Sequence, residues 1–313
     1  MSTIGSSATV SAESVRASIA GGRRSDASGT FFQILLLGSL LFSLAVLAIL
    51  IADVLSRAIP VFAERGIDFL TAPLSSDPAK AGVGQGIVGT AILGGIVALL
   101  AFPFGLMTAI YLEEYAADNK VTRFIQINIR NLAGVPSVVY GLLGLSVFVA
   151  FMNAIDDKGN GRNIIAGGMT LAVLVLPIVI ITGIEALRAV PNTIREAGYG
   201  VGASRWEVTR MLVLPAAAPG VLTGTVLALS RALGETAPLI LAGAVLGSFS
   251  GLNIATLFTG SYTALPVIVY DWSRKPGDAF RADAAAAIVV LLVITLFANG
   301  IAILLRNRYE RAW

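Results

Sequence analysis

The chain has 313 residues, of which 56% are hydrophobic and only 13% charged, and its mean hydropathy of +0.83 is far above that of soluble globular domains. Cysteine and histidine are both absent, which excludes disulfides, thiol nucleophiles, metal sites built on these residues, and Ser/His or Cys/His catalysis. The small net charge of +3 fits membrane orientation better than nucleic-acid binding.

Apolar runs divide the chain into six stretches, each long enough to cross a bilayer as a helix. Residues 1–30 are rich in Ser, Ala and Gly and are expected to form a disordered cytoplasmic tail. The first apolar run is long enough to remain as a spanning helix, unlike a cleaved signal peptide. The prediction is an all-α membrane protein whose transmembrane domain, 31–313, has six transmembrane helices at about 31–55, 86–112, 124–152, 164–184, 217–247 and 283–306.

The distribution of positive charge predicts the orientation. Lys and Arg are more numerous in the segments on the side of the two termini than in those on the opposite side. Because Lys and Arg accumulate on the cytoplasmic side of membrane proteins, both termini are expected in the cytoplasm.

Near the second span, Gly84, Gly86 and Gly89 satisfy the dinucleotide pattern G-x-G-x-x-G. A loop precedes them and a membrane helix follows, whereas a dinucleotide fold requires a strand and a soluble helix. We therefore interpret Gly86, Thr90 and Gly94 as a stripe of small residues for close helix packing. The sequence contains no P-loop pattern, so we expect no ATP site of that kind.

The connection 185–216 differs from the other loops and contains the string "EALRAVPNTIREAGYGVGASRWEVTRMLVLP". Pro191 is expected to end the preceding helix, and Asn192 or Thr193 can cap a short new one. A glycine-rich stretch then allows a turn before the chain resumes through Trp206. The pattern predicts a compact knob on the cytoplasmic surface.

This segment resembles the cytoplasmic signature of ABC importer permeases, which reads E-A-A, three residues, G, nine residues and I-x-L-P. The resemblance implies a type I ABC importer permease fold, in which the loop forms a coupling helix that docks on a cytosolic ATPase subunit. Gly198 replaces the second Ala of the signature, and Leu212 replaces its Ile. The alternative is an ordinary amphipathic loop. The coupling-loop residues are Glu196, Ala197, Gly198, Gly202, Arg205, Trp206, Leu212 and Pro215, of which Glu196, Arg205 and Trp206 are polar or aromatic anchors.

A pair of charges interrupts the fifth apolar run, which reads "ALSRALGETAPLIL" at 228–241. Arg231 and Glu235 are the only charges between Met211 and Tyr270, and an arginine at the middle of a spanning helix costs about 2.5–3.5 kcal/mol on insertion scales. Four residues apart, the two side chains share a helix face and can pair. A guanidinium fork is well shaped to hold a tetrahedral oxyanion. The residues alone leave open a second interpretation, in which the pair only ties this helix to a neighbour.

Four further strings are similar to those of the permease subunits (PstA type) of phosphate ABC transporters. This resemblance extends from about residue 84 to the C-terminus and implies roles for Arg231 and Glu235 in phosphate passage, with Thr236 beside them. It also implies a multi-pass location in the bacterial inner membrane. The strings are "FPFGLMTAIYLEEYA" at 102–116, "LAGVPSVVYGLLGL" at 132–145, "RALGETAPL" at 231–239 and "YTALPVIVYDW" at 262–272. The closing string "AAAAIVVLLVITLFANGIAILLRNRYE" at 284–310 is similar as well.

The same resemblance implies three kinds of partner. They are a second phosphate permease subunit (PstC type), a dimer of cytosolic ATPase subunits (PstB type) and an extracytoplasmic phosphate-binding protein (PstS type). ATP would be hydrolysed by the ATPase partners. The chain itself is therefore expected to carry no catalytic residue and to bind no cofactor or metal.

The sequence also permits other functions, and it contains further charged residues with expected places. A permease for another oxyanion, such as sulfate or molybdate, would use the same features. In an ion-coupled secondary carrier, Glu235 would be the proton site, whereas a membrane assembly factor would need no transport role for Arg231. Glu113 and Glu114 are expected to form a solvated helix end, and Arg130 to reach interfacial water.

Overall fold

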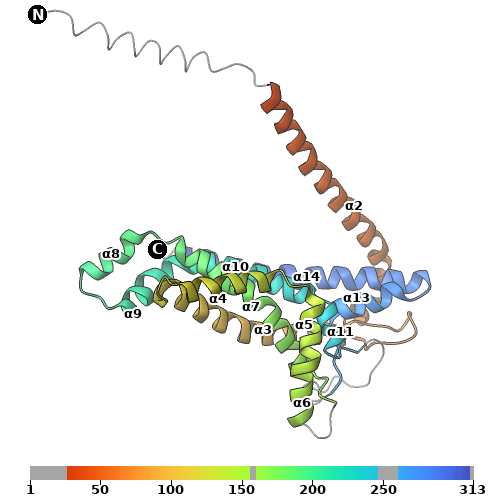
Figure 1. Ribbon diagram of the computed structural model, residues 1–313. Coiled ribbons are helices and arrows are strands. Elements are labelled where there is room, and N and C mark those ends of the chain that lie inside the picture. Colours follow the sequence, from red (N-terminus) through yellow and green to blue (C-terminus); the bar gives the residue numbers. More distant parts are fainter. Residues whose placement is uncertain (1–26, 156–159, 246–259, 311–313) are drawn as a thin grey trace, which may run out of the picture. The chain divides into compact units, whose positions relative to one another are not determined.

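The computed structural model describes residues 27–155, 160–245 and 260–310, which are nearly all helical (Figure 1). Short π-helical segments, labelled η, interrupt the α-helices at three places within these ranges. The elements are α2 (Ala27–Thr71), α3 (Gly84–Ile110), η1 (Tyr111–Tyr115), α4 (Lys120–Ala133), α5 (Ser137–Leu143), η2 (Gly144–Val149), α6 (Ala150–Ile155), α7 (Ile164–Arg188), α8 (Asn192–Gly200), α9 (Arg205–Val208), η3 (Thr209–Val213), α10 (Leu214–Gly234), α11 (Ala237–Leu241), α13 (Leu265–Arg274) and α14 (Asp278–Glu310).

Six helical stretches in the described residues are long and apolar enough to cross a membrane. The prediction of an all-α fold with six spanning helices is confirmed. The stretches are Ser28–Thr71, Gly84–Tyr115, Ser137–Ile155, Ile164–Arg188, Arg205–Gly234 and Asp278–Arg308.

The start of α2 belongs to a unit of its own that ends at Asp53. Its large apolar side chains are exposed, with Phe42 at 71% and Ile49 at 68%. Such a surface suits lipid rather than water. Most of the predicted tail, 1–26, lies outside the described residues, but 27–30 are helical and not part of a tail.

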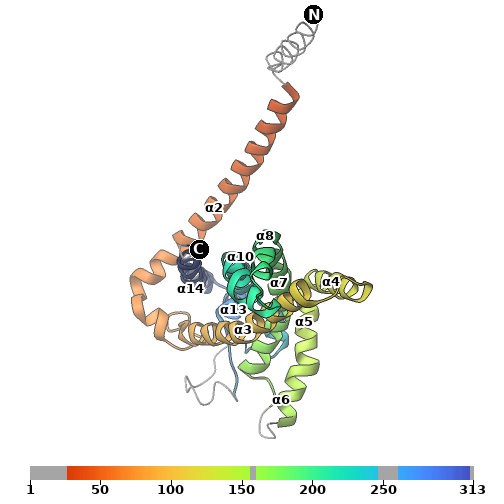
Figure 2. The same ribbon diagram turned by 90° about the vertical axis from the view of Figure 1, so that its left-hand side faces the viewer.

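In the second unit, residues 54–313, the core forms around α7. This helix packs against α3 and α10, and Figure 2 shows the three side by side. Of its apolar stretch, 67% is buried, which is more than in the other described spans. The buried residues that α3, α7 and α10 contribute to the main core include Leu93, Val97, Leu171, Val175, Ala228 and Ala232.

The third span differs from the expected helix over 124–152. Helix α4 ends at Ala133, and α5 begins at Ser137. Pro136 explains the break, because a proline disfavours helical geometry in the residue before it and donates no backbone hydrogen bond. The hydroxyl of Tyr140 donates to the oxygen of Leu132 at 2.8 Å, which satisfies a carbonyl in the last turn of α4.

Two regions expected to be loops are partly helical. Helix α2 continues to Thr71 instead of ending near residue 55, although Gly66 has a non-helical φ of 51°. Within 248–282, the stretch Leu265–Arg274 forms α13. The loop predictions were wrong there because these segments are amphipathic and lack the long apolar run that marks a span.

The small-residue stripe on α3 packs closely, as predicted. The hydroxyl of Thr90 accepts a hydrogen bond from the backbone N–H of Leu265 at 2.9 Å, and a side chain added at Gly86 would collide with Ile268. Beside the stripe, a side chain added at Gly89 would collide with the backbone oxygen of Thr263. Gly89→Val should therefore cost about 1–3 kcal/mol of stability and lower the melting temperature of the purified protein. Gly95→Val is the control, because nothing lies within 4 Å of the added group. An equal loss for both variants would contradict the close packing.

Candidate functional site

The charged pair of the fifth span lies at the end of a helix instead of its middle. Helix α10 ends at Gly234, and Glu235 has extended geometry with φ −81° and ψ 126°. Pro238 explains this end: in a continuous helix its ring would clash with the carbonyl of Gly234, four residues earlier. The expected continuous helix over 217–247 is therefore wrong, and residues 246 and 247 lie outside the described part.

Arg231 and Glu235 still pair across this interruption. Arg231 Nε lies 3.4 Å from Glu235 Oε1, and the two side chains are 44% and 20% exposed. Arg231 stands in the last turn of α10, where the negative end of the helix dipole favours a cation. The guanidinium is thus weakly paired and not sealed inside this chain.

The residues around the pair fix the interruption in place. Thr236 donates from Oγ1 to the oxygen of Pro266 at 3.4 Å, so its hydroxyl contacts the start of α13. Ser230 contacts Asn299 of α14 at 2.7 Å, one residue before Arg231. The end of α10 is therefore connected to α13 and α14, and no sequence pattern indicated either contact.

The loop between α7 and α10 folds into a knob made of α8, α9 and η3, seen at the left end of Figure 1. Gly202 adopts a φ of 84°, which suits glycine, and turns the chain between the two helices. Ser204 and Glu207 form a capping box that starts α9. Pro215 lies in the first turn of α10, where a proline is tolerated.

The signature residues fall on two sides of the knob. Glu196 and Ala197 are exposed on α8. Gly198 is buried, and a Cβ there would lie 2.8 Å from Leu212 Cδ1 and from a methyl group of Val208. The departure from the signature at Gly198 therefore matches the close packing of α8 on the returning chain.

Three large apolar side chains of the knob, on α8, α9 and the turn between them, are exposed. We call these three residues the knob tip. Its aromatic and aliphatic side chains are unusually exposed for their size, and aromatic residues are typical anchors of protein interfaces. The knob tip consists of Tyr199 (46% exposed), Val201 (85%) and Trp206 (54%).

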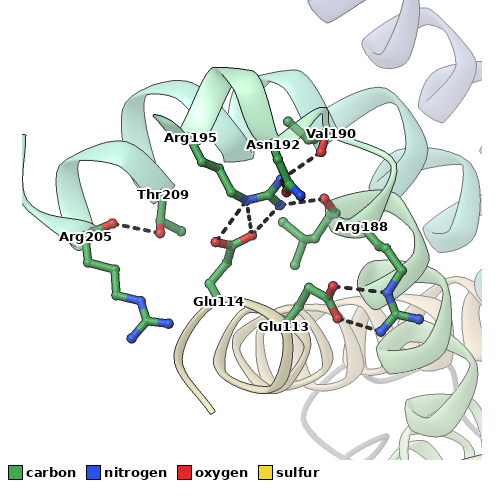
Figure 3. Close-up of polar contacts among 9 residues, drawn as sticks. Glu113, Glu114, Arg188, Val190, Asn192, Arg195, Arg205 and Thr209 are labelled. Carbon is green, nitrogen blue, oxygen red and sulfur yellow. Dashed lines mark hydrogen bonds and ion pairs between the residues drawn. The ribbon is translucent and has the colours of Figure 1, made fainter. Parts of the chain in front are cut away.

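The predicted solvated end at Glu113 and Glu114 is wrong. Both residues belong to η1, directly after α3, and bind arginines from the knob side (Figure 3). Arg188 donates to both carboxylate oxygens of Glu113, at 3.1 and 2.9 Å. Arg195 Nη2 lies 2.6 Å from Glu114 Oε1, with the side chains only 15% and 5% exposed. We call these four residues the clasp.

A third contact lies beside the clasp. The guanidinium carbon of Arg205 lies 5.1 Å from the centre of the Tyr115 ring, a cation–π distance. Arg205, which the sequence predicts as an ATPase anchor, also contacts η1 within this chain, and its predicted role stays a prediction. Local sequence periodicity could not reveal these pairs, because Glu114 and Arg195 are 81 positions apart. The only available signal was two adjacent acidic residues at the end of an apolar helix.

Comparisons with known proteins agree with this fold. The family model described as "Binding-protein-dependent transport system inner membrane component" matches residues 101–311. The chain belongs to this family. Solved structures of similar fold include a bacterial alginate ABC transporter, at a TM-score of 0.58 and 17% identity over 87% of this chain and 93% of that one. The MetNI methionine ABC transporter aligns at a TM-score of 0.53 and 18% identity, over 74% and 95%.

Several relatives of this chain are named as permease proteins of phosphate transport systems. The phosphate transport system permease protein PstA 1 of Mycobacterium tuberculosis (strain CDC 1551 / Oshkosh) is 35% identical over 217 residues, 69% of this chain and 68% of the relative. PstA of Haemophilus influenzae is 30% identical over 263 residues, 82% and 87% of the two chains. PstC of Mesorhizobium japonicum is 31% identical over 258 residues, 76% and 77%. The predicted type I ABC importer permease fold is confirmed.

Proposed function

We propose that this chain is the membrane permease subunit of an ATP-driven phosphate importer. The names of its relatives support phosphate as the substrate, and one feature of the site carries the proposal. This feature is the guanidinium of Arg231, kept at the interruption between α10 and α11 with a 3.4 Å contact to Glu235.

An interrupted helix with a charge at its end is a common design for ion sites within membranes. Backbone that is not helical is tolerated at membrane depth where it lines a water-filled path or is buried in protein. A buried ion pair alone would be replaced by apolar residues at little cost or even a gain. An exchangeable guanidinium, by contrast, can hold a passing phosphate through paired, charge-assisted hydrogen bonds. Glu235 then keeps Arg231 in place between transport events and repels a phosphate that lingers.

The knob is the part of this chain that would receive the work of ATP hydrolysis. Its exposed tip offers aromatic anchors to a dimer of cytosolic ATPase subunits (PstB type). The helical stretch Arg205–Gly234 runs from the knob to Arg231 without a described gap, a distance of about 40 Å. A push on the knob therefore reaches the guanidinium through one continuous helix.

The remaining partners complete the importer. A second permease subunit (PstC type) would form the other wall of the pathway, and a phosphate-binding protein (PstS type) would deliver the anion on the side opposite the knob. The Lys and Arg distribution supports cytoplasmic termini. ATP is bound and hydrolysed by the partner subunits, so this chain performs no bond chemistry.

Copurification followed by an anion-specific ATPase assay tests this proposal. The chain, expressed with its neighbouring subunits, should purify with two ATPase copies, and phosphate with its binding protein should stimulate ATP hydrolysis in vesicles. Stimulation by sulfate or molybdate instead would make it a permease for another oxyanion. Purification without an ATPase, together with proton-dependent uptake, would make it a secondary carrier.

A further inference from the structure

From the clasp we infer that Glu114 and Arg195 are positioning residues that fasten the coupling helix α8 to the ends of α3 and α7, so that the knob and these spans move as one body during transport. The inference rests on the proposed function, since it concerns how work applied to the knob reaches the membrane. It assigns a transport role to two residues that lie far from Arg231 and outside the exposed knob tip.

The guanidinium of Arg195 donates hydrogen bonds to η1, to α7 and to the connection between α7 and α8. Its Nε and Nη2 donate to the Glu114 carboxylate of η1, at 3.2 and 2.6 Å. Nη2 also donates to the oxygen of Leu187 in α7 at 2.9 Å, and Nη1 to the oxygen of Val190 at 2.7 Å. Arg195 itself belongs to α8. One side chain thus joins α8 to the last turn of α7, to the residues that follow it and to the end of α3 (Figure 3).

The π-helical turn of η1 presents both carboxylates of the clasp. The N–H of Ala116 bonds to the oxygen of Tyr111 at 2.7 Å, five residues earlier, which widens the last turn of the span. Glu113 then binds Arg188 of α7 while its neighbour Glu114 binds Arg195 of α8. Short π-helical insertions are frequent at functional sites, and this one makes two adjacent acidic residues bind two different helices.

The strength of the clasp distinguishes it from ordinary surface pairs. Arg130 and Glu185, nearby on α4 and α7, share one contact of 3.5 Å and are both 56% exposed, and such pairs contribute little. Glu114 is 5% exposed, so removing its charge leaves a cation buried without its partner. The Glu114–Arg195 pair of the clasp is therefore expected to hold when the ATPase subunits move the knob, whereas the Arg130–Glu185 pair is not.

Without the clasp, α8 would be free to hinge at its two ends. Its covalent connections to α7 are Ala189 to Pro191, and α8 leads to the returning chain through the turn at Gly202. A closing ATPase pair would then bend α8 at these points instead of moving α3 and α7. The consequence is ATP hydrolysis with little transport.

The first test measures phosphate transported per ATP hydrolysed, using the complete complex in proteoliposomes. Glu114→Gln should lower this ratio by about two- to thirtyfold, the range of coupling changes measured along contact networks, while ATP hydrolysis continues. Asp283→Asn is the matched control, because Asp283 pairs with Arg65 at 3.2 Å with the same exposures of 15% and 5% and belongs to α14. Its ratio should stay at the wild-type value. An unchanged ratio in Glu114→Gln, in a wild-type complex that does transport phosphate, overturns the inference.

The second test does not depend on a stable single variant. Glu114→Cys with Arg195→Cys removes both charges together, and the chain has no other cysteine. In a complex whose other subunits lack cysteine, a short bifunctional thiol reagent should restore the transport-to-ATP ratio, whereas a reagent that blocks each thiol separately should not. If the cross-link stops transport, α3 and α8 must separate during the cycle, and the inference is wrong. A wild-type complex that moves no phosphate would instead refute the proposed function.

Discussion

Arg231→Gln should lower phosphate uptake by about a hundredfold or more at low phosphate, with the complex assembled at normal abundance. Two hydrogen bonds from a charged donor contribute about 1.5–3 kcal/mol each, and about 1.4 kcal/mol corresponds to a tenfold change. Arg231→Lys keeps the charge but loses the planar fork, so it should retain part of the uptake. The measurement is radiolabelled phosphate uptake by proteoliposomes that contain the complete complex.

Arg281→Gln is the matched control for this variant. Arg281 also contacts its partner, Asp278, at 3.4 Å and is 59% exposed, but it lies at the start of α14, away from the α10–α11 interruption. Its loss should leave uptake within about twofold, since exposed pairs contribute little. If the exchange of both Arg231 and Glu235 for Gln left uptake unaltered, the role assigned to the pair would be wrong.

Trp206→Ala should weaken the binding of the ATPase subunits by about 30-fold or more. Truncating a central aromatic anchor of an interface costs at least about 2 kcal/mol, and Trp206 is 54% exposed at the knob tip. The capping box of Ser204 and Glu207 fixes α9, so the exposure belongs to a defined surface. On dilution, the complex should lose its ATPase subunits. Size-exclusion chromatography of the diluted complex measures this loss.

Leu99→Ala provides the comparison for this second variant. Leu99 is 73% exposed on α3, within an apolar spanning stretch, so its truncation removes a similar kind of surface away from the knob. The ATPase should stay bound. Equal retention of ATPase by the Trp206 and Leu99 variants would show that the knob tip is not the docking surface.

The long spans were predictable because they depend on composition and length. A helix such as α7, 25 residues from Ile164 to Arg188, has an apolar run that only a bilayer or a large core accommodates. The breaks were harder to predict. Pro136 and Pro238 both mark helix interruptions in the structure, but prolines also lie inside α3, α7 and α10 without ending them. Proline alone therefore does not decide where a membrane helix stops.

Some features of the candidate sites were likewise predictable from the sequence, and others were not. Arg231 stands out from sequence because a charge is rare in an apolar run. Its pairing with Glu235 was also predictable, but the extended geometry at Glu235 was not. The clasp could not be predicted, since the burial of Glu114 depends on a knob that folds back from 81 positions later. Short-range patterns contain no information about that contact.

We propose that Arg231 faces a water-filled path used by phosphate. A cysteine at Gly234 tests it with the arginine intact, because this position is exposed, nothing lies within 4 Å of an added Cβ, and the chain has no native cysteine. In the assembled complex, a charged, water-soluble thiol reagent should modify Gly234→Cys, and phosphate should slow the reaction. Lack of modification from either side of the membrane, with and without ATP, would contradict the account, provided that Gly200→Cys on the knob reacts.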